Sequence, residues 1–234
     1  MAAITSEADE LMAAHPGHQS GPSHQSVVPF VELSPDLTWL PEDDRIFLPM
    51  KQLLGPGFIW GCSEGVAGSF NESHDHKWHC DRSGQIDLQY TRIKIMIYLQ
   101  SMRKETGCLR VIPGSHHADF HRSLLSPVRE HNAKPGADVF GVAGSDLCCH
   151  ALEVDPGDVV VFNHYLFHAV YGKQPLRRYI ALKFAEPPKT EAHYDALREH
   201  NQDASRLHDS YRNSDRPRVR GMVEKLLEWE KELG

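Results

Sequence analysis

Residues whose side chains bind metal ions stand close together near position 80. His79 and Asp81 are separated by a single residue, so on an extended strand both side chains point to the same side. A second histidine, His168, follows 87 residues after Asp81 at the end of an apolar run. Two imidazoles and one carboxylate form the facial triad of non-heme iron(II) oxygenases, which leaves positions on the metal open. This donor set suits iron(II) better than a structural zinc ion.

Other arrangements of donors stay open at this stage, because a His-x-Asp tripeptide is common and the chain contains 16 histidines. The pair could bind zinc together with the neighbouring His74 and His76, or it could be a polar pair at the solvent-facing end of a strand. His164 competes with His168 for the third position. The surrounding sequence is therefore needed to choose among these alternatives.

Three further motifs follow in a fixed order. Residues Gly107 to His116 read GCLRVIPGSH, residues Asp155 to Phe162 read DPGDVVVF, and an arginine pair follows His168 at positions 177 and 178. Together with the WHCD segment, this order resembles the phytanoyl-CoA dioxygenase family of iron(II)- and 2-oxoglutarate-dependent oxygenases. The resemblance extends roughly from Phe58 to Glu186.

The resemblance implies a mainly β fold. The expected architecture is a double-stranded β-helix, a jelly-roll or cupin-like barrel of two facing sheets with α-helices packed outside. His79, Asp81 and His168 would then hold Fe(II), 2-oxoglutarate would take two further positions on the metal, and O2 the last. Ascorbate would support activity in vitro. The expected reaction is hydroxylation, or another oxidation, of an unactivated C–H bond of a small organic substrate with release of succinate and CO2.

The 2-oxoglutarate cosubstrate needs a cationic partner inside the barrel for the carboxylate that points away from the metal. Arginine suits this role because its planar guanidinium binds a carboxylate through two parallel hydrogen bonds. Arg177 and Arg178 are adjacent, so only one of them faces inward on a strand. Alignment with the last strand of the family selects Arg177, nine residues after His168, and leaves Arg178 as the alternative.

A strand is expected from Tyr90 to Leu99, where two faces alternate with period two. By resemblance, the face of Arg92, Lys94 and Met96 lies inside the barrel and is the expected cofactor-binding face. Cations inside a barrel are costly unless an anion meets them. We therefore expect Lys94 or Arg92 to contact the cosubstrate or an anionic substrate; the alternative is that both are surface residues of an edge strand.

Composition divides the chain into three parts. Residues 1–26 are expected to be a flexible N-terminal segment with a short helix from Ser6 to Ala14. Residues 27–187 form the expected oxygenase core, within which 121–147 is predicted to be a long irregular loop over the barrel mouth that acts as a lid. Residues 188–234 form a helical extension whose apolar stripe is expected to pack on the core or on a partner subunit.

Charge and cysteine content narrow the possible partners and compartment. The formal net charge is −7 and basic blocks are absent from the sequence, which argues against nucleic acid as the main partner. The sequence contains neither a long apolar run nor a signal-peptide pattern, which predicts a soluble protein that is not associated with a membrane. Five cysteines without framework spacing indicate reduced thiols and a cytoplasmic location.

A small-molecule substrate is thus the expected partner, with a homodimer through the C-terminal helices as a further possibility. The competing functional hypothesis is a non-catalytic or zinc-binding β-barrel that serves as a small-molecule binding module. Such a module would keep the fold and lack 2-oxoglutarate turnover. Fold-level resemblance does not identify the substrate.

Overall fold

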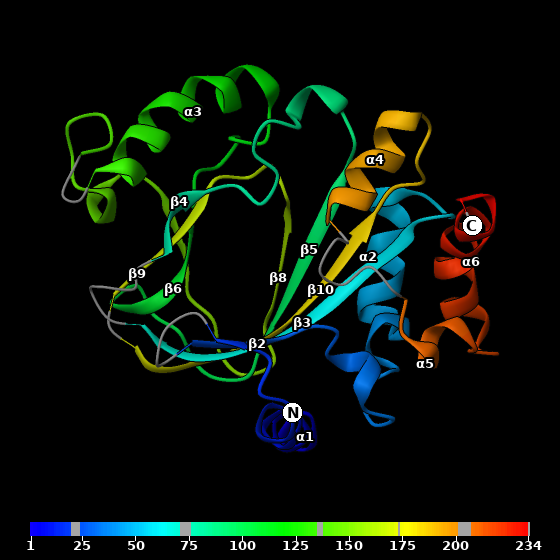
Figure 1. Cartoon of the computed structure of the whole chain (residues 1–234). Coiled ribbons are helices and arrows are strands. Elements are labelled where there is room, and N and C mark those ends of the chain that lie inside the picture. Colours follow the sequence, from blue (N-terminus) through cyan, green and yellow to red (C-terminus); the bar gives the residue numbers. More distant parts are fainter. Residues whose placement is uncertain (20–23, 71–75, 135–137, 173, 201–206, 234) are drawn as a thin grey trace.

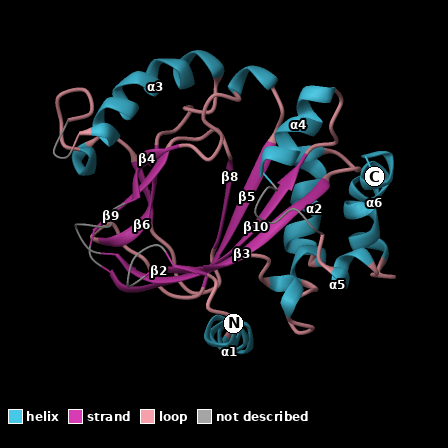
Figure 2. Ribbon diagram, in the orientation of Figure 1, coloured by secondary structure: helices cyan, strands magenta, loops and turns pink. Residues whose placement is uncertain are grey.

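The computed structural model describes residues 1–19, 24–70, 76–134, 138–172, 174–200 and 207–233. Two antiparallel sheets face each other across the middle of the molecule, and helices lie on their outer sides (Figure 1, Figure 2). The predicted double-stranded β-helix with flanking helices is confirmed.

The larger sheet has six strands in the order β1-β2-β3-β10-β5-β8, and neighbouring strands pair in antiparallel fashion. The two long strands β3 and β10 lie side by side at its centre. Its strands are β1 His18–Gln19, β2 His24–Val27, β3 Ile59–Phe70, β10 Gln174–Ala185, β5 Arg92–Tyr98 and β8 Val159–Asn163.

The smaller sheet has four strands in the order β4-β9-β6-β7, again antiparallel. It carries both histidines of the predicted metal motif, because they lie on the neighbouring strands β4 and β9. Its strands are β4 His76–His79, β9 His168–Gly172, β6 Thr106–Val111 and β7 His150–Leu152.

Helices cover the outer sides of both sheets. The α-helices are α1 Ala2–Ala14, α2 Asp44–Leu54, α3 Ala118–Ala133, α4 Glu191–His200, α5 Asp209–Arg212 and α6 Pro217–Leu233. Short 3₁₀ turns are η1 Val31–Leu33, η2 Leu40–Glu42, η3 Ile86–Leu88 and η4 Gly144–Asp146. Among the described helices, none is long and apolar enough to cross a membrane.

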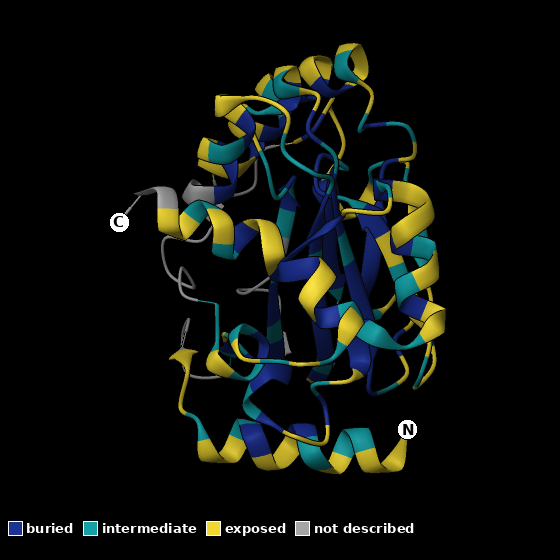
Figure 3. Ribbon diagram, turned by 90° about the vertical axis from the view of Figure 1, so that its right-hand side faces the viewer, coloured by how far each residue is buried: buried dark blue, intermediate teal, exposed yellow. Residues whose placement is uncertain are grey.

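The period-two pattern of β5 separates two cores. Ile93, Ile95 and Ile97 pack outward against apolar residues of α2, α5 and α6. Met96 and Tyr98 point inward and join residues of both sheets in the central core. The alternation is the one that the sequence predicts, because successive side chains of a strand project to opposite faces. Figure 3 shows the strands mostly buried and the helices with exposed outer faces.

The predicted amphipathic C-terminal helix is confirmed as α6. Val219, Met222 and Val223 are buried in the same core as the outward face of β5. The apolar stripe of this helix therefore packs on the barrel of its own chain, which is one of the two arrangements expected from the sequence. The expected domain boundaries at residues 26 and 187 remain predictions.

The N-terminal segment differs from the flexible tail expected for residues 1–26. Helix α1 begins at Ala2 and buries Ala8 and Leu11 in the outer core, and β2 pairs with β3. Asp9 of this helix forms an ion pair with Arg178 on β10 at 2.5 Å. The sequence does not show this because the apolar side of the helix is narrow and its partners lie far away along the chain.

The irregular loop expected over residues 121–147 is wrong for the part that forms α3. His121, Leu124, Val128 and His131 are buried at helical spacing, and the helix continues through Pro127. Leu124 and Val128 pack on strands β4 and β9 of the smaller sheet. The helical spacing was present in the sequence, but the proline and the polar residues around it favoured a loop.

Candidate metal centre

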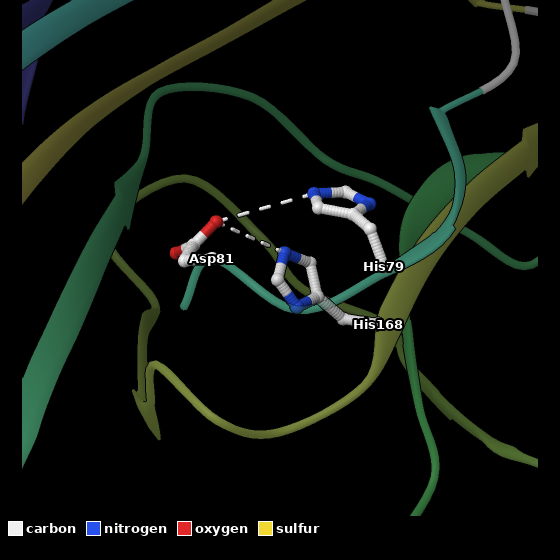
Figure 4. A group of neighbouring side chains, drawn as sticks. All are labelled: His79, Asp81 and His168. Atoms are coloured by element: carbon white, nitrogen blue, oxygen red, sulfur yellow. Dashed lines mark ion pairs between the residues drawn. The ribbon is translucent and has the colours of Figure 1, made fainter. Parts of the chain in front are cut away.

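The predicted triad comes together at one end of the smaller sheet. His79 is the last residue of β4, His168 is the first residue of β9, and the two are direct partners in the antiparallel register. Asp81 follows two residues after β4 and turns back toward both rings (Figure 4). Its Oδ1 lies 4.0 Å from His79 Nε2 and 3.7 Å from His168 Nε2.

One ligand atom from each of these three residues lies within 4.8 Å of the other two. The arrangement offers two imidazole nitrogens and one carboxylate oxygen from one side, which is the donor set of a facial triad. Side-chain exposure is 40% for His79, 18% for Asp81 and 5% for His168, so the centre opens toward His79.

Backbone carbonyls orient both histidines. Nδ1 of His79 lies 2.8 Å from the carbonyl oxygen of Lys77, and Nδ1 of His168 lies 2.9 Å from that of Leu166. A carbonyl only accepts hydrogen bonds, so Nδ1 of each ring donates. In a neutral ring this leaves the lone pair on Nε2, the atom that faces Asp81. Such second contacts are how proteins commonly orient metal-binding histidines. The residues present therefore fit a divalent metal ion.

The charge states of the centre also suit metal binding. Burial lowers the pKa of His168 to about 4, although Asp81 opposes the shift, so the ring is neutral at pH 7. Burial alone would raise the pKa of Asp81, but Lys94 and the histidines hold it well below its usual range. Burial raises the pKa of the intervening Cys80 to about 11, which keeps this thiol protonated and a poor competing ligand.

The competing third ligand predicted from the sequence does not join the group. His164 is buried, and burial holds its pKa well below the usual range, but it is absent from the donor cluster found among the described residues. His74 lies outside the described residues, so the alternative zinc site with His74 and His76 is not tested.

Of the residues on the inward face of β5, Lys94 is the one that reaches the triad. Its Nζ lies 3.4 Å from Oδ2 of Asp81, the carboxylate oxygen that does not face the histidines. Arg92 lies at the end of the strand and donates from Nη1 to the carbonyl oxygen of Ala196 on α4 at 3.0 Å. Met96 is buried in the central core, where the Tyr98 hydroxyl donates to its sulfur at 3.8 Å.

The side chains of the two arginines near the start of β10 project to opposite faces of the strand, as expected for adjacent residues. Arg177 is buried, and its guanidinium lies over the ring of Tyr179 at 4.6 Å from the centroid. Arg178 points the other way and pairs with Asp9 of α1 and with Gln100. The inward member of the pair is therefore Arg177, the residue selected from the sequence.

Two charged residues inside the barrel were missed by the sequence reasoning. Glu64 on β3 and Lys183 on β10 form an ion pair of 3.1 Å. Lys183 lies six residues after Arg177, so it shares the inward face of β10 with that arginine. The even spacing between Arg177 and Lys183 was the signal in the sequence that could have identified Lys183. The glycines around Glu64 made its strand difficult to predict from the sequence.

The family model described as phytanoyl-CoA dioxygenase (PhyH) matches residues 66–172. This segment contains the whole predicted triad and the two motifs between its halves. Over this segment the chain matches the phytanoyl-CoA dioxygenase family model. The match confirms the resemblance, and with it the class of enzyme, that the order of motifs predicts. No curated protein sequence matches the chain.

Several solved structures share the fold of this chain. HygX from Streptomyces hygroscopicus, with nickel and 2-oxoglutarate bound, has a TM-score of 0.62 at 20% identity, covering 81% of this chain and 79% of that chain. EctD from S. alaskensis has a TM-score of 0.57 at 18% identity, covering 79% and 68%. The α-ketoglutarate-dependent epimerase SnoN has a TM-score of 0.56 at 16% identity, covering 79% and 72%. At these identities the likeness shows the fold alone.

Proposed function

We propose that this protein is an Fe(II)- and 2-oxoglutarate-dependent dioxygenase that oxidises an unactivated C–H bond of a small organic substrate. The observation that carries the proposal is the convergence of His79, Asp81 and His168, with both Nε2 atoms facing one carboxylate oxygen. When bound, iron(II) and 2-oxoglutarate would supply the activation of O2, with succinate and CO2 as products. HygX, which shares the fold, has been solved with iron and with nickel and 2-oxoglutarate.

The three ligands would hold the metal from one side and leave the opposite side for cosubstrate and O2. His168 provides a neutral ring because burial disfavours its protonation, and Asp81 provides the negative charge. The carboxylate at position 81 also closes the coordination position that a halide would otherwise take. This favours hydroxylation, or a related oxidation, over halogenation.

Lys94 would hold a carboxylate of 2-oxoglutarate beside the metal. Its ammonium is paired with Asp81 at 3.4 Å, and a divalent cation on Asp81 would repel it. Burial tends to neutralise a lysine, but Asp81 raises the pKa of Lys94, so the group is a cation. A buried cation displaced from its partner needs another anion, and the dianionic cosubstrate would provide one.

Arg177 would bind the distal carboxylate of 2-oxoglutarate, since it is the inward member of the arginine pair and is buried on β10. Loss of a buried charge partner costs on the order of 2 to 5 kcal/mol, which is more than tenfold in affinity. Arg177→Ala should therefore weaken 2-oxoglutarate binding at least tenfold. Arg178→Ala, which removes an outward cation from the same strand, is the matched control and should leave this affinity unchanged. The opposite ranking would refute the anchor.

Formation of succinate from 2-oxoglutarate in the presence of Fe(II), ascorbate and O2 tests the proposed reaction without knowledge of the substrate. His168→Ala should abolish succinate formation and weaken Co(II) binding, followed by visible absorption, whereas His164→Ala should retain both. Full activity in His168→Ala would remove this residue from the triad. Wild-type protein that binds zinc tightly and forms no succinate with Fe(II) would favour the non-catalytic binding module.

A further inference from the structure

An ion pair lies inside the barrel on the larger sheet. Nζ of Lys183 on β10 is 3.1 Å from Oε2 of Glu64 on β3. Lys183 alternates with Leu182 and Phe184, which pack outward in the helix-covered core, so its own side chain points to the interior. The side chains of Lys183 and Glu64 keep 13% and 20% of their surface exposed, so neither is fully enclosed by protein.

The pair stands next to the proposed metal centre. Lys183 is the direct cross-strand partner of Lys94, and Lys94 contacts Asp81. The next residues on the same inward faces, Met96 and Ala181, are apolar and lie in the central core. Arg177 lies beyond them on the inward face of β10. Apolar residues thus separate Arg177 from a second charged region at the level of the triad, which is the level at which a substrate must present its reacting bond.

Stability alone does not explain a pair of this kind. A buried ion pair loses hydration, and apolar residues of similar size often stabilise a core as well or better. The two side chains have more hydrogen-bonding capacity than their mutual contact uses, because an ammonium has three donors and a carboxylate two acceptor oxygens. Burial raises the pKa of Glu64, but Lys183 and Lys94 lower it further, so the carboxylate is ionised.

A hydroxyl group fits this pair better than a hydrocarbon chain. It can donate a hydrogen bond to the carboxylate and accept one from the ammonium at the same time. An aliphatic chain in the same place would exclude water from both charged groups without forming hydrogen bonds to them, which is costly in free energy. Sites built in this way also reject analogues that lack the hydroxyl group.

We propose that Glu64 and Lys183 form a substrate-recognition subsite beside the metal centre, and that the substrate is a polyhydroxylated small molecule rather than an aliphatic acyl chain. The proposal rests on the proposed oxygenase function, because it takes the interior next to the triad as the place of the substrate.

The test uses three six-carbon probes: myo-inositol as a neutral polyol, glucosamine as an amino sugar, and hexanoate as an acyl chain. Their binding to the full-length protein loaded with Ni(II) and 2-oxoglutarate is measured by isothermal titration calorimetry. We expect at least one of the two hydroxylated probes to bind at least tenfold more tightly than hexanoate.

The variant that tests the subsite is Glu64→Gln combined with Lys183→Met, because removing both charges leaves neither one buried alone. It should lower the affinity for the hydroxylated probe at least tenfold. The matched control is Arg212→Met combined with Glu230→Gln, which removes an ion pair of 2.8 Å between α5 and α6, away from the barrel interior. This control should bind the probes as the wild type does.

Two results would overturn the subsite: hexanoate binding as tightly as both hydroxylated probes, or an unchanged affinity in the interior double variant. Succinate formation without added substrate separates this outcome from failure of the proposed function. The interior double variant should retain it, because neither residue is assigned to the metal or to the cosubstrate. Wild-type protein that forms no succinate would refute the proposed oxygenase function. The binding measurements with the three probes would still test the subsite of Glu64 and Lys183.

Discussion

Replacing Lys94 with methionine is expected to change the affinities for metal and for 2-oxoglutarate in opposite directions. Without metal, the Lys94 ammonium neutralises Asp81 across 3.4 Å. A divalent cation must displace this ammonium and then coexist with it, so Lys94 opposes metal binding. The cosubstrate restores the balance by bringing an anion. Lys94→Met should therefore bind metal more tightly alone and 2-oxoglutarate more weakly afterwards.

The size of the effect follows from the geometry. Two unit charges at this separation attract with about 5 kcal/mol at an effective dielectric constant of 20. Partial exposure of both side chains and the residual pairing in the metal-bound state reduce this value. We expect a net change of about 1.5 to 3 kcal/mol, which is about tenfold to a hundredfold in each affinity.

Co(II) binding followed by visible absorption at pH 8 measures the first affinity, and calorimetry with 2-oxoglutarate on the Ni(II)-loaded protein measures the second. At pH 8 the Asp81 carboxylate of the wild type is ionised, because its pKa lies well below the usual range. Arg178→Met is the matched control, because it removes one cation from the outer face of β10, where Arg178 pairs with Asp9. Weaker Co(II) binding in Lys94→Met would refute the electrostatic reasoning, and an unchanged 2-oxoglutarate affinity would remove Lys94 from the cosubstrate site.

Three further predictions concern the scaffold of the protein. Trp78, next to His79, is fully buried and donates from its indole N–H to the carbonyl oxygen of Gly144 at 2.8 Å. Trp78→Phe leaves this carbonyl without its donor and should reduce the free energy of unfolding, measured in urea, by about 1 to 3 kcal/mol. A reduction below about 0.5 kcal/mol would show that this hydrogen bond does not stabilise the position of β4. Glu32 is buried outside the barrel and accepts hydrogen bonds from Trp60 and Ser63. Burial raises the pKa of Glu32 although these hydrogen bonds oppose it, so the folded state retains the proton and loses stability as pH rises from about 4.3, the unfolded value, through the folded pKa. The Glu32→Gln side chain does not titrate, so the variant should gain stability relative to the wild type between pH 4 and pH 7, as measured by urea unfolding. The expected gain is about 1.4 kcal/mol for every pH unit between the unfolded and the folded pKa of Glu32. A difference in stability that stays constant with pH would contradict the raised pKa. Finally, the backbone amides near Leu124 and Val128 in α3 should exchange slowly with solvent hydrogen without ligands, because this helix packs on the smaller sheet. Exchange as fast as in exposed loops would support the predicted mobile lid instead.

The chemistry of the centre could be predicted from the sequence because it depends on local spacing. His79 and Asp81 lie two residues apart beside a strand, and the strand from Arg92 to Tyr98 alternates with a strict period of two. Both features follow from the geometry of a single extended segment. The third member of the triad, His168, lies far away in the chain, and its selection over His164 came from the family's order of motifs.

Contacts between distant segments could not be predicted in the same way. The sequence of α1 does not show that Ala8 and Leu11 meet the outer core, and the region of α3 looked irregular because Pro127 interrupts its pattern. In each case the element is stabilised by a surface that belongs to another part of the chain. Local propensity is weak where such packing decides the outcome.

The sequence by itself determined the His79 and Asp81 pair, the alternating strand and the charge at each position. It also limited the inward arginine to one of two neighbours. The tertiary structure decided which charges meet: Lys94 with Asp81, Glu64 with Lys183, and Arg178 with Asp9 outside the barrel. The physical reason is that an electrostatic interaction depends on the distance in space and on the local dielectric, and both are fixed only when the two sheets close on each other.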